Sequence, residues 1–378
     1  MGEGHRRMSE DGMSENAPPN SLAVLVKKPR AETVIEALRE EGVYDDGRKV
    51  TEHDDGTVAL PVTAPPQETS VLEVMRQTDP ELRAPELADL LAARGWTDEE
   101  LALAPSSWAV IGSILSVHLD EDCPREEEVG EALLELHGEA DTVLSDGGVS
   151  GVHREPDSRM IAGIGETETI HTEHGTKYAL DLADVMFSPG NKAERARMGR
   201  VVTGEDGPSP ETDSEGAERV FDMFAGIGYF TLPMARAGAR VTAAEINPTA
   251  YRFLIENAVL NDVTANVEAY RADCRDVEVS DADRVVMGYY GVETGDGEDG
   301  SRSQEAHEFL DTAFDAVAPG GIVHVHAATP ESRLWDRPVG RIEDAADRAG
   351  RGVEIEGKRR VKSHSEGVWH VVCDVRVE

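Results

Sequence analysis

A glycine turn between an apolar stretch and an amphipathic one constrains the fold of this chain more than any other feature. Residues 220–224 are mostly apolar, and Gly226 and Gly228 lie in the small-residue turn that follows. An amphipathic stretch then begins at Phe230. This pattern predicts a strand, a tight turn and a helix. Because glycine lets a backbone approach a ligand closely and a helix N-terminus offers free N–H groups, the turn is a candidate binding loop.

An acidic residue after the next predicted strand strengthens this interpretation. Residues 241–244 read as a strand that leads to Glu245, about 20 residues beyond the glycine turn. An acid at that place accepts hydrogen bonds from the ribose hydroxyls of an adenosine. Thr231 stands where the dinucleotide fingerprint has its third glycine. The sequence therefore favours an adenosine without a pyrophosphate, S-adenosylmethionine (SAM), over a dinucleotide.

Strand and helix patterns alternate through the rest of this region. A third predicted strand leads to Asp273, where an acid can accept from the adenine amino group, and the backbone N–H of Cys274 can help read the adenine ring. The alternation predicts an α/β fold with a parallel, doubly wound sheet. The strand over 368–377 should be antiparallel, because no helix separates it from the strand before it. Active residues should lie at the carboxyl ends of the parallel strands, at Asp222, Glu245, Asp273 and Tyr289.

Four motifs resemble a known enzyme family. They are Asp222-Met-Phe-Ala-Gly-Ile-Gly-Tyr-Phe, Glu245-Ile-Asn-Pro, Glu256-Asn-x-x-Leu-Asn261 and Ala282-Asp-Arg-Val-Val-Met-Gly-Tyr289. Together they look like the tRNA position-37 modification family of class I SAM enzymes. That family contains guanine-N1 methyltransferases and the aminocarboxypropyltransferases of the wyosine/wybutosine pathway. The resemblance covers residues 106–378 and implies a Rossmann-like catalytic domain.

The fourth motif separates the two branches of this family. Methyltransferases carry Asn-Leu-Pro or a similar sequence there, whereas this chain has Met287-Gly288-Tyr289. The motif resembles the aminocarboxypropyltransferase branch, as do segments 186–195 and 367–377. The resemblance implies transfer of the 3-amino-3-carboxypropyl group of SAM to C7 of 4-demethylwyosine at position 37 of tRNA(Phe), with release of 5′-methylthioadenosine. A guanine-37 N1-methyltransferase, and a tRNA-binding protein with a non-catalytic SAM site, are the alternatives.

The resemblance also implies which residues hold SAM. Ser188 and Arg195 would lie near the methionine moiety, where a guanidinium suits a carboxylate bidentately; an ordinary helix N-cap is the alternative for Ser188. Arg154 stands where the family often has Arg, and a surface salt bridge is its alternative role. The expected SAM-binding residues are Ser188, Arg195, Asp222, Gly226, Glu245, Asp273 and Cys274.

No residue is assigned a catalytic proton transfer, and two are candidates for contact with the reacting groups. Asp222 would approach the SAM amino group or serve only the turn. Tyr289, with Tyr290, would stack the flipped base or serve ordinary packing. The three cysteines lack Cys-x-x-Cys or Cys–His pairing, so the sequence predicts neither a metal site nor a disulfide.

The charge of the chain bears on its partner. Seventy-five acidic residues against 37 basic ones give a net charge of −38, which suits either a generally acidic protein or adaptation to molar salt. Acidity opposes RNA binding, but at 1 M salt the Debye length is only about 3 Å. Contact with the anticodon loop of tRNA(Phe) would then depend on local basic clusters. The candidate RNA contacts are Lys192, Arg197, Arg200, Lys358, Arg359 and Arg360.

Composition shifts divide the chain into five parts. We expect a disordered tail over 1–20, a small α+β module over 21–66, an acidic helical linker over 67–105, an α+β domain over 106–186 and the SAM-binding domain over 187–378. Within the fourth part, residues 178–182 should complete a mixed sheet. Segments 203–218 and 291–303 look like surface insertions. No apolar run of 18 residues and no apolar leader is present, which predicts a cytoplasmic protein without a membrane span.

Overall fold

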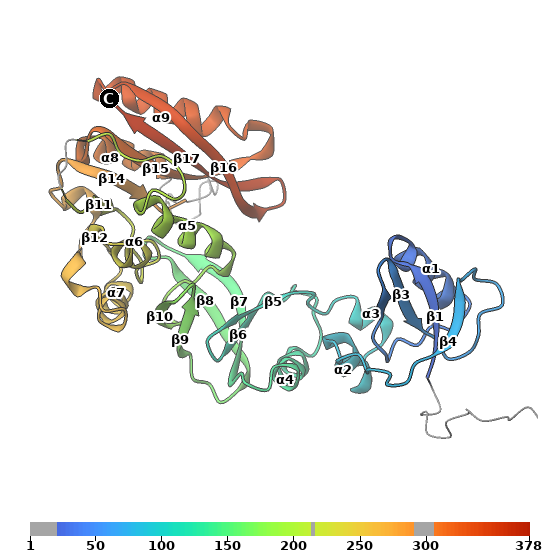
Figure 1. Cartoon of the computed structure of the whole chain (residues 1–378). Coiled ribbons are helices and arrows are strands. Elements are labelled where there is room, and N and C mark those ends of the chain that lie inside the picture. The colour runs from blue at the N-terminus through green and yellow to red at the C-terminus, as the bar shows by residue number, and fades with distance from the viewer. Residues whose placement is uncertain (1–20, 213–215, 291–305) are drawn as a thin grey trace, which may run out of the picture. The chain divides into compact units, whose positions relative to one another are not determined.

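The computed structural model describes residues 21–212, 216–290 and 306–378. The chain divides after Glu86 into two compact units, each described here by itself (Figure 1). The expected tail over 1–20 and insertion over 291–303 lie outside the described residues. No helix within the described ranges is long and apolar enough to cross a bilayer.

The first unit is a four-stranded antiparallel sheet with one helix of ten residues, α1 (Ala31–Glu40). The strands lie in the order β2-β3-β1-β4, and they are β1 (Leu22–Lys27), β2 (Thr51–Asp54), β3 (Thr57–Pro61) and β4 (Glu73–Arg76). Val34 and Leu38 of α1 pack into the core with Val24 and Leu60. The period of α1 and the alternation of β1 therefore bury the same cluster.

The expected helical linker over 67–105 is wrong in its first half. Strand β4 falls inside it and pairs with the edge of β1, so that residues 67–86 belong to the first unit. The backbone groups on that edge of β1 need partners, and this requirement outweighs the helix-like spacing of a few apolar residues. Helices appear only in the second half of the expected linker, as α2 (Leu87–Ala93) and α3 (Asp98–Leu101).

The second unit opens with a four-stranded sheet in the order β5-β6-β7-β8. Its elements are β5 (Trp108–Ile111), β6 (Ile114–Val117), α4 (Glu126–Leu136), β7 (Thr142–Ser150) and β8 (Glu155–Gly163). The hairpin of β5 and β6 turns at Gly112, whose φ of +59° lies in the left-handed region. Leu91 of α2 and Leu133 of α4 are fully buried in the core of this sheet.

Strands β9 (Glu168–Glu173) and β10 (Thr176–Asp181) form a separate antiparallel pair. The expectation that residues 178–182 complete a mixed sheet is therefore wrong. The free edge of β10 is hydrogen-bonded by side chains instead: Asn257 contacts both the N–H and the carbonyl of Ala179, and Asn261 does the same for Lys177. Two side-chain amides, one within a helix and one at its C-cap, thus take the place of a neighbouring strand.

The rest of the second unit is a seven-stranded sheet in the order β13-β12-β11-β14-β15-β17-β16. Strands β11 to β15 run parallel, and β17 is antiparallel to both neighbours. The strands are β11 (Arg219–Asp222), β12 (Arg240–Ala244), β13 (Val267–Tyr270), β14 (Ala282–Met287), β15 (Val317–Pro330), β16 (Val353–Ser365) and β17 (Val368–Val377). The predicted doubly wound sheet with an antiparallel last strand is confirmed.

Helices cover both faces of this sheet, as its parallel strands require. They are α5 (Lys192–Val202), α6 (Thr231–Arg236) and α7 (Pro248–Leu260) against one face, and α8 (Leu310–Ala316) and α9 (Asp336–Ala349) against the other. Along β11, Val220 packs in the cluster with α7, and Phe221 in the cluster with α8 and α9. The first cluster also contains Ile114 and Tyr178, so one core joins the smaller sheet to the large one.

Candidate active site

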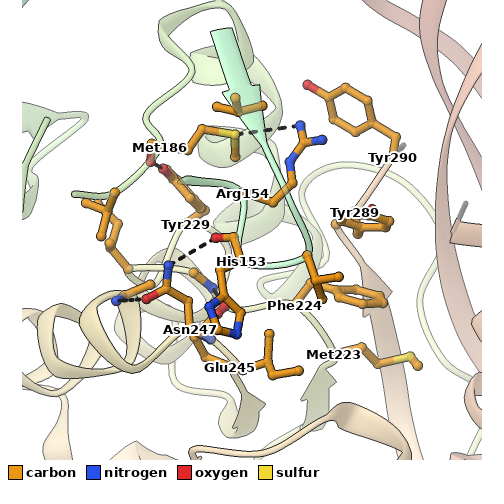
Figure 2. Close-up of a pocket in the computed structure, with 18 of the residues that line it drawn as sticks. His153, Arg154, Met186, Met223, Phe224, Tyr229, Glu245, Asn247, Tyr289 and Tyr290 are labelled. Atoms are coloured by element: carbon orange, nitrogen blue, oxygen red, sulfur yellow. Dashed lines mark hydrogen bonds between the residues drawn. The ribbon is translucent and has the colours of Figure 1, made fainter. Parts of the chain in front are cut away.

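A cavity of about 570 Å³ lies at the carboxyl ends of the parallel strands (Figure 2). Its wall comes from the loops after β11, β12, β13 and β14, from the β7–β8 connection, and from the segment before α5. This volume falls within the range of about 300–1,000 Å³ for small-molecule sites. The topology therefore gathers segments between residues 148 and 364 around one small-molecule pocket.

The glycine turn forms one wall of this cavity and holds an acid in place. The N–H of Gly226 donates to Oε2 of Glu245 at 2.7 Å, and the N–H of Asn247 donates to Oε1 at 2.7 Å. Gly226 has a φ of +56°, and a Cβ there would lie 2.8 Å from the ring of Tyr229. A side chain at this position would be strained and would displace the donor to Glu245.

Burial raises the pKa of Glu245 to about 7, although its two backbone donors act in the opposite direction. Asp222 is close enough to raise this pKa further by like-charge repulsion. At neutral pH the carboxyl group is thus divided between its two protonation states. A ligand that donates hydrogen bonds to it, as two ribose hydroxyls do, favours the ionised form.

The expected acid at the end of β11, Asp222, does not line the cavity. Its side chain is fully buried, accepting from the Thr231 hydroxyl at 2.7 Å and from the Phe224 N–H at 3.4 Å. Burial raises its pKa to about 6. This geometry does not support the expected contacts of Asp222 with SAM or the reacting groups. It favours the alternative role, because Asp222 joins the turn to the first residue of α6.

Asp273 and Cys274 both line the cavity after β13. Asp273 accepts from the Arg275 side chain at 2.8 and 2.5 Å and from its N–H at 3.0 Å, and these bonds hold the pKa of Asp273 below its usual range. Burial raises the pKa of the Cys274 thiol to about 12, so the sulfur stays protonated. Any contribution of Cys274 to ligand binding must then come from its backbone or its packing.

Arg195 lines the cavity, but its charge is already paired. Its side chain is only 2% exposed, and it donates to both oxygens of Glu173 at 2.7 and 2.8 Å. Burial acts to raise the pKa of Glu173. The hydrogen bonds from His171 and Arg195 have a larger combined effect and lower this pKa to about 2. The bidentate partner of Arg195 is therefore Glu173, where a ligand carboxylate was expected. Glu173 was missed because nothing in the sequence of β9 distinguishes it from other surface acids.

Ser188 lines the same part of the wall and is held from two sides. Its carbonyl accepts from Arg195 at 2.8 Å, and its Oγ accepts from Nζ of Lys362 at 2.6 Å. Ser188 does occupy the N-cap position of the short 3-10 helix Pro189–Asn191, but its side chain makes no capping hydrogen bond, so the capping role expected of the hydroxyl is not seen. Lys362 belongs to β16 and was not among the expected site residues, although it ends a basic run from residue 358.

Aromatic side chains close the cavity near the end of β14. The ring of Tyr289 stacks on Phe224 with centroids 5.2 Å apart, and the Arg154 guanidinium lies 5.7 Å from the Tyr289 centroid. Tyr290 stacks on His370 with centroids 3.8 Å apart. Figure 2 shows Arg154 and Tyr290 at one end of the pocket and Glu245 at the other. Each tyrosine packs against a neighbour while still lining the cavity.

Two of the six expected RNA contacts are instead part of a buried ionic network. Asp374 accepts from Arg197 at 2.9 Å, from Arg359 at 2.7 Å and from His324 at 2.6 Å, and Arg359 also pairs with Glu194. The prediction of RNA contact is wrong for Arg197 and Arg359, because the helix period and the strand alternation turn both guanidinium groups inward. The candidates left exposed are Lys192, Arg200, Lys358 and Arg360.

No group of three or more His, Cys, Asp or Glu residues is arranged to hold a metal ion in the parts of the chain that the structure describes. The cysteines at 123, 274 and 373 are all buried free thiols.

Comparison with known proteins agrees with this arrangement. Three family models match successive parts of the chain: the tRNA methyltransferase 5 N-terminal domain at 23–70, the TYW2 N-terminal domain at 87–167 and the TRM5/TYW2 methyltransferase domain at 169–356. A tRNA(Phe) (4-demethylwyosine(37)-C(7)) aminocarboxypropyltransferase of Pyrococcus horikoshii is 37% identical over 283 residues, which are 74% of this chain and 92% of that protein. The chain belongs to the TRM5/TYW2 family.

Solved structures of TRM5/TYW2 proteins share the fold. P. horikoshii TYW2, solved in complex with MeSAdo, is 33% identical with a TM-score of 0.62, over 77% of this chain and 97% of its own. Trm5b from Pyrococcus abyssi is 31% identical with a TM-score of 0.67, over 95% of this chain and 99% of its own. The resemblance inferred from the four motifs is confirmed, and so is the fold class.

Proposed function

We propose that this chain transfers the 3-amino-3-carboxypropyl group of SAM to C7 of 4-demethylwyosine at position 37 of tRNA(Phe). The observation that carries the proposal is its 37% identity to the P. horikoshii aminocarboxypropyltransferase over 283 residues, which are 74% of this chain and 92% of that protein. The Met287-Gly288-Tyr289 motif, which distinguishes the two branches, contributes Gly288 and Tyr289 to that wall.

The cavity suits SAM in both size and chemistry. Carboxylates of Glu245 and Asp273 supply hydrogen-bond acceptors for the ribose hydroxyls and the adenine amino group. Cationic and polar groups, among them Arg154 and Ser188, lie on the wall that remains for the amino-acid part. A ligand that carries an adenosine at one end and a zwitterion at the other matches this distribution of charge.

The reaction needs orientation more than proton transfer. The bond between the sulfonium and the γ-carbon of the aminocarboxypropyl group breaks, and its electron pair leaves with 5′-methylthioadenosine. C7 of the base forms the new carbon–carbon bond and then loses its proton. The protein holds the γ-carbon, rather than the methyl carbon, in line with the base, and such positioning supplies a large part of the rate. Tyr289 and Tyr290 are placed to stack the base beside that carbon.

The tRNA approaches the open side of this cavity. Lys192 follows the cavity-lining segment directly, and the exposed Arg200 is paired with Asp206 at 3.0 Å. On β16, Arg360 stacks over Trp369 at 4.7 Å, and Lys358 is exposed. These four cations, two on α5 and two on the strand that also bears His364, are the proposed contacts with the anticodon loop of tRNA(Phe).

One observation favours the alternative, a tRNA guanine-37 N1-methyltransferase. Residues 23–70 match the tRNA methyltransferase 5 N-terminal domain, and P. abyssi Trm5b is similar over almost the whole chain. The cavity motif and the closer identity to the aminocarboxypropyltransferase outweigh this module, because the module lies outside the unit that contains the cavity.

The identity of the carbon transferred from SAM distinguishes the aminocarboxypropyltransferase from the methyltransferase. The protein is incubated with tRNA that contains 4-demethylwyosine and with SAM labelled either in the methyl or in the carboxyl carbon. The carboxyl label should enter the tRNA, and the methyl label should stay in 5′-methylthioadenosine. A parallel reaction uses tRNA with unmodified guanosine 37, the substrate of the alternative; methyl label in that tRNA, with S-adenosylhomocysteine as the second product, would establish the methyltransferase instead.

A further inference from the structure

We propose that Lys362 is a positioning residue that turns the hydroxyl proton of Ser188 into the cavity and, with it, selects ligands that carry a carboxylate. The inference deepens the proposed function and rests on it, since the carboxylate is that of the aminocarboxypropyl group of SAM. Lys362 and Ser188 are 174 positions apart in the sequence and meet through a hydrogen bond of 2.6 Å.

The direction of this hydrogen bond follows from the two groups. A lysine ammonium has three donors and no acceptor, so the oxygen of Ser188 must accept. The single hydroxyl proton of Ser188 therefore cannot point at Lys362 and has to find an acceptor elsewhere. Ser188 lines the cavity, and the carbonyl of the same residue is already used by Arg195. The hydroxyl is thereby left as a donor for a ligand, with its acidity increased by the adjacent positive charge.

The pairing of charges around Ser188 also indicates Lys362 as the residue that matters for a ligand carboxylate. The guanidinium of Arg195 is neutralised by Glu173, in a bidentate pair that is almost completely buried. Lys362, by contrast, forms no ion pair with any carboxylate in the described ranges, and the same holds for Arg154 of the cavity wall. His364, two residues along β16, has its pKa lowered by burial and then by Lys362 and Arg154. This end of the cavity therefore has uncompensated positive charge in a chain of net charge −38.

The backbone beside Lys362 is shaped for its approach. A Cβ on Gly190 would lie 2.9 Å from Cδ of Lys362, so a larger residue there would press on the side chain that reaches Ser188. The next residue, Asn191, donates through its N–H to the Ser188 carbonyl at 3.2 Å and through its amide to the Tyr290 hydroxyl at 3.3 Å. Asn191 thus links Ser188 to Tyr290, and Tyr290 lies at the end of the pocket away from Glu245 (Figure 2).

This placement explains how a SAM molecule would be aligned. Its ribose is drawn toward the acid at one end, and its carboxylate toward Ser188 and Lys362 at the other. The sulfonium and the γ-carbon then lie between the bound ribose and the bound carboxylate, next to the tyrosines proposed to stack the base. Loss of the carboxylate anchor frees the γ-carbon to rotate while the adenosine stays bound.

The test compares SAM with 5′-methylthioadenosine, which lacks the aminocarboxypropyl group and with it the positive charge of the sulfonium. Dissociation constants of SAM and of 5′-methylthioadenosine are measured by calorimetry, at one KCl concentration, for the wild type, Lys362→Met, Lys362→Arg and Ser188→Ala. Lys358→Met is the matched control, because Lys358 lies on the same strand, is exposed, and approaches the ring of Trp335 at 5.8 Å rather than the cavity.

We expect Lys362→Met to weaken SAM at least about tenfold, as is typical of lost hydrogen bonds to a charged group, and to leave 5′-methylthioadenosine unchanged. Lys362→Arg should restore part of the loss, and the double variant with Ser188→Ala should lose less than the sum of the single effects. Equal weakening of both ligands would show a structural role and overturn the inference, as would unchanged binding of SAM. Because binding alone is measured, the result does not depend on which carbon of SAM is transferred.

Discussion

Ionisation of the Glu245 carboxyl group should lower the stability of the unliganded protein, although the ionised form is the one that suits ligand binding. Burial raises the pKa of this carboxyl group from its ordinary value of 4.5 to about 7. The folded protein then holds the proton more tightly than the unfolded chain does. Its stability therefore falls as the pH rises from about 4.5 to about 7, and the cost is fully present above pH 7. Replacing the carboxylate by the neutral amide of Glu245→Gln removes this pH-dependent cost.

The size of the effect follows from the two pKa values. Each pH unit between them is worth about 1.4 kcal/mol, so the cost between pH 5.5 and pH 8.5 is at most about 2 kcal/mol. The real value should be somewhat smaller, because Glu245 is partly exposed to the cavity. The amide also loses one of the two backbone donors from Gly226 and Asn247, which costs about 1 kcal/mol at every pH.

The assay is urea unfolding of the wild type and Glu245→Gln at pH 5.5 and 8.5, in the same KCl concentration. The stability of the variant relative to the wild type should improve by about 1–2 kcal/mol from the lower to the higher pH. Affinity for SAM should change in the opposite sense: the wild type should bind more tightly as the pH rises through 7, and the variant should bind weakly at both values. A stability difference that is independent of pH would refute the argument from burial, and a variant that binds SAM like the wild type would refute the ribose contact.

Two further predictions concern charge in the rest of the molecule. The melting temperature should rise from low to molar KCl, because salt screens the self-repulsion of a chain with net charge −38; an unchanged melting temperature would rule out the hypothesis of salt adaptation. Asp374→Asn should destabilise the fold by about 3–5 kcal/mol, because it leaves the buried guanidinium groups of Arg197 and Arg359 without their shared carboxylate. The exposed Glu354→Gln on β16 is the control for the second prediction, and chemical denaturation that finds equal stability for both variants would show that the network contributes little.

Local patterns in the sequence were sufficient to predict the main strands, turns and helices of the catalytic domain. The glycine turn after β11, the acid after β12 and the missing helix before β17 are features of short segments, and each predicts its element through the period of the side chains or the geometry of a turn. Parallel strands bring their carboxyl ends to one edge, so the positions of Glu245 and Asp273 on the cavity wall also follow from topology.

The sequence by itself therefore determined the class of fold, the edge of the sheet that forms the site and the family, while only the tertiary structure decided which charges are available there. Arg195, Arg197 and Arg359 appeared free in the sequence, and each is neutralised by an acid from another element. Lys362 appeared to be one more surface base and instead reaches Ser188. The physical reason is that pairing depends on the distance between side chains of different elements, often more than 100 residues apart, whereas the patterns that predict helices and strands extend over a few residues.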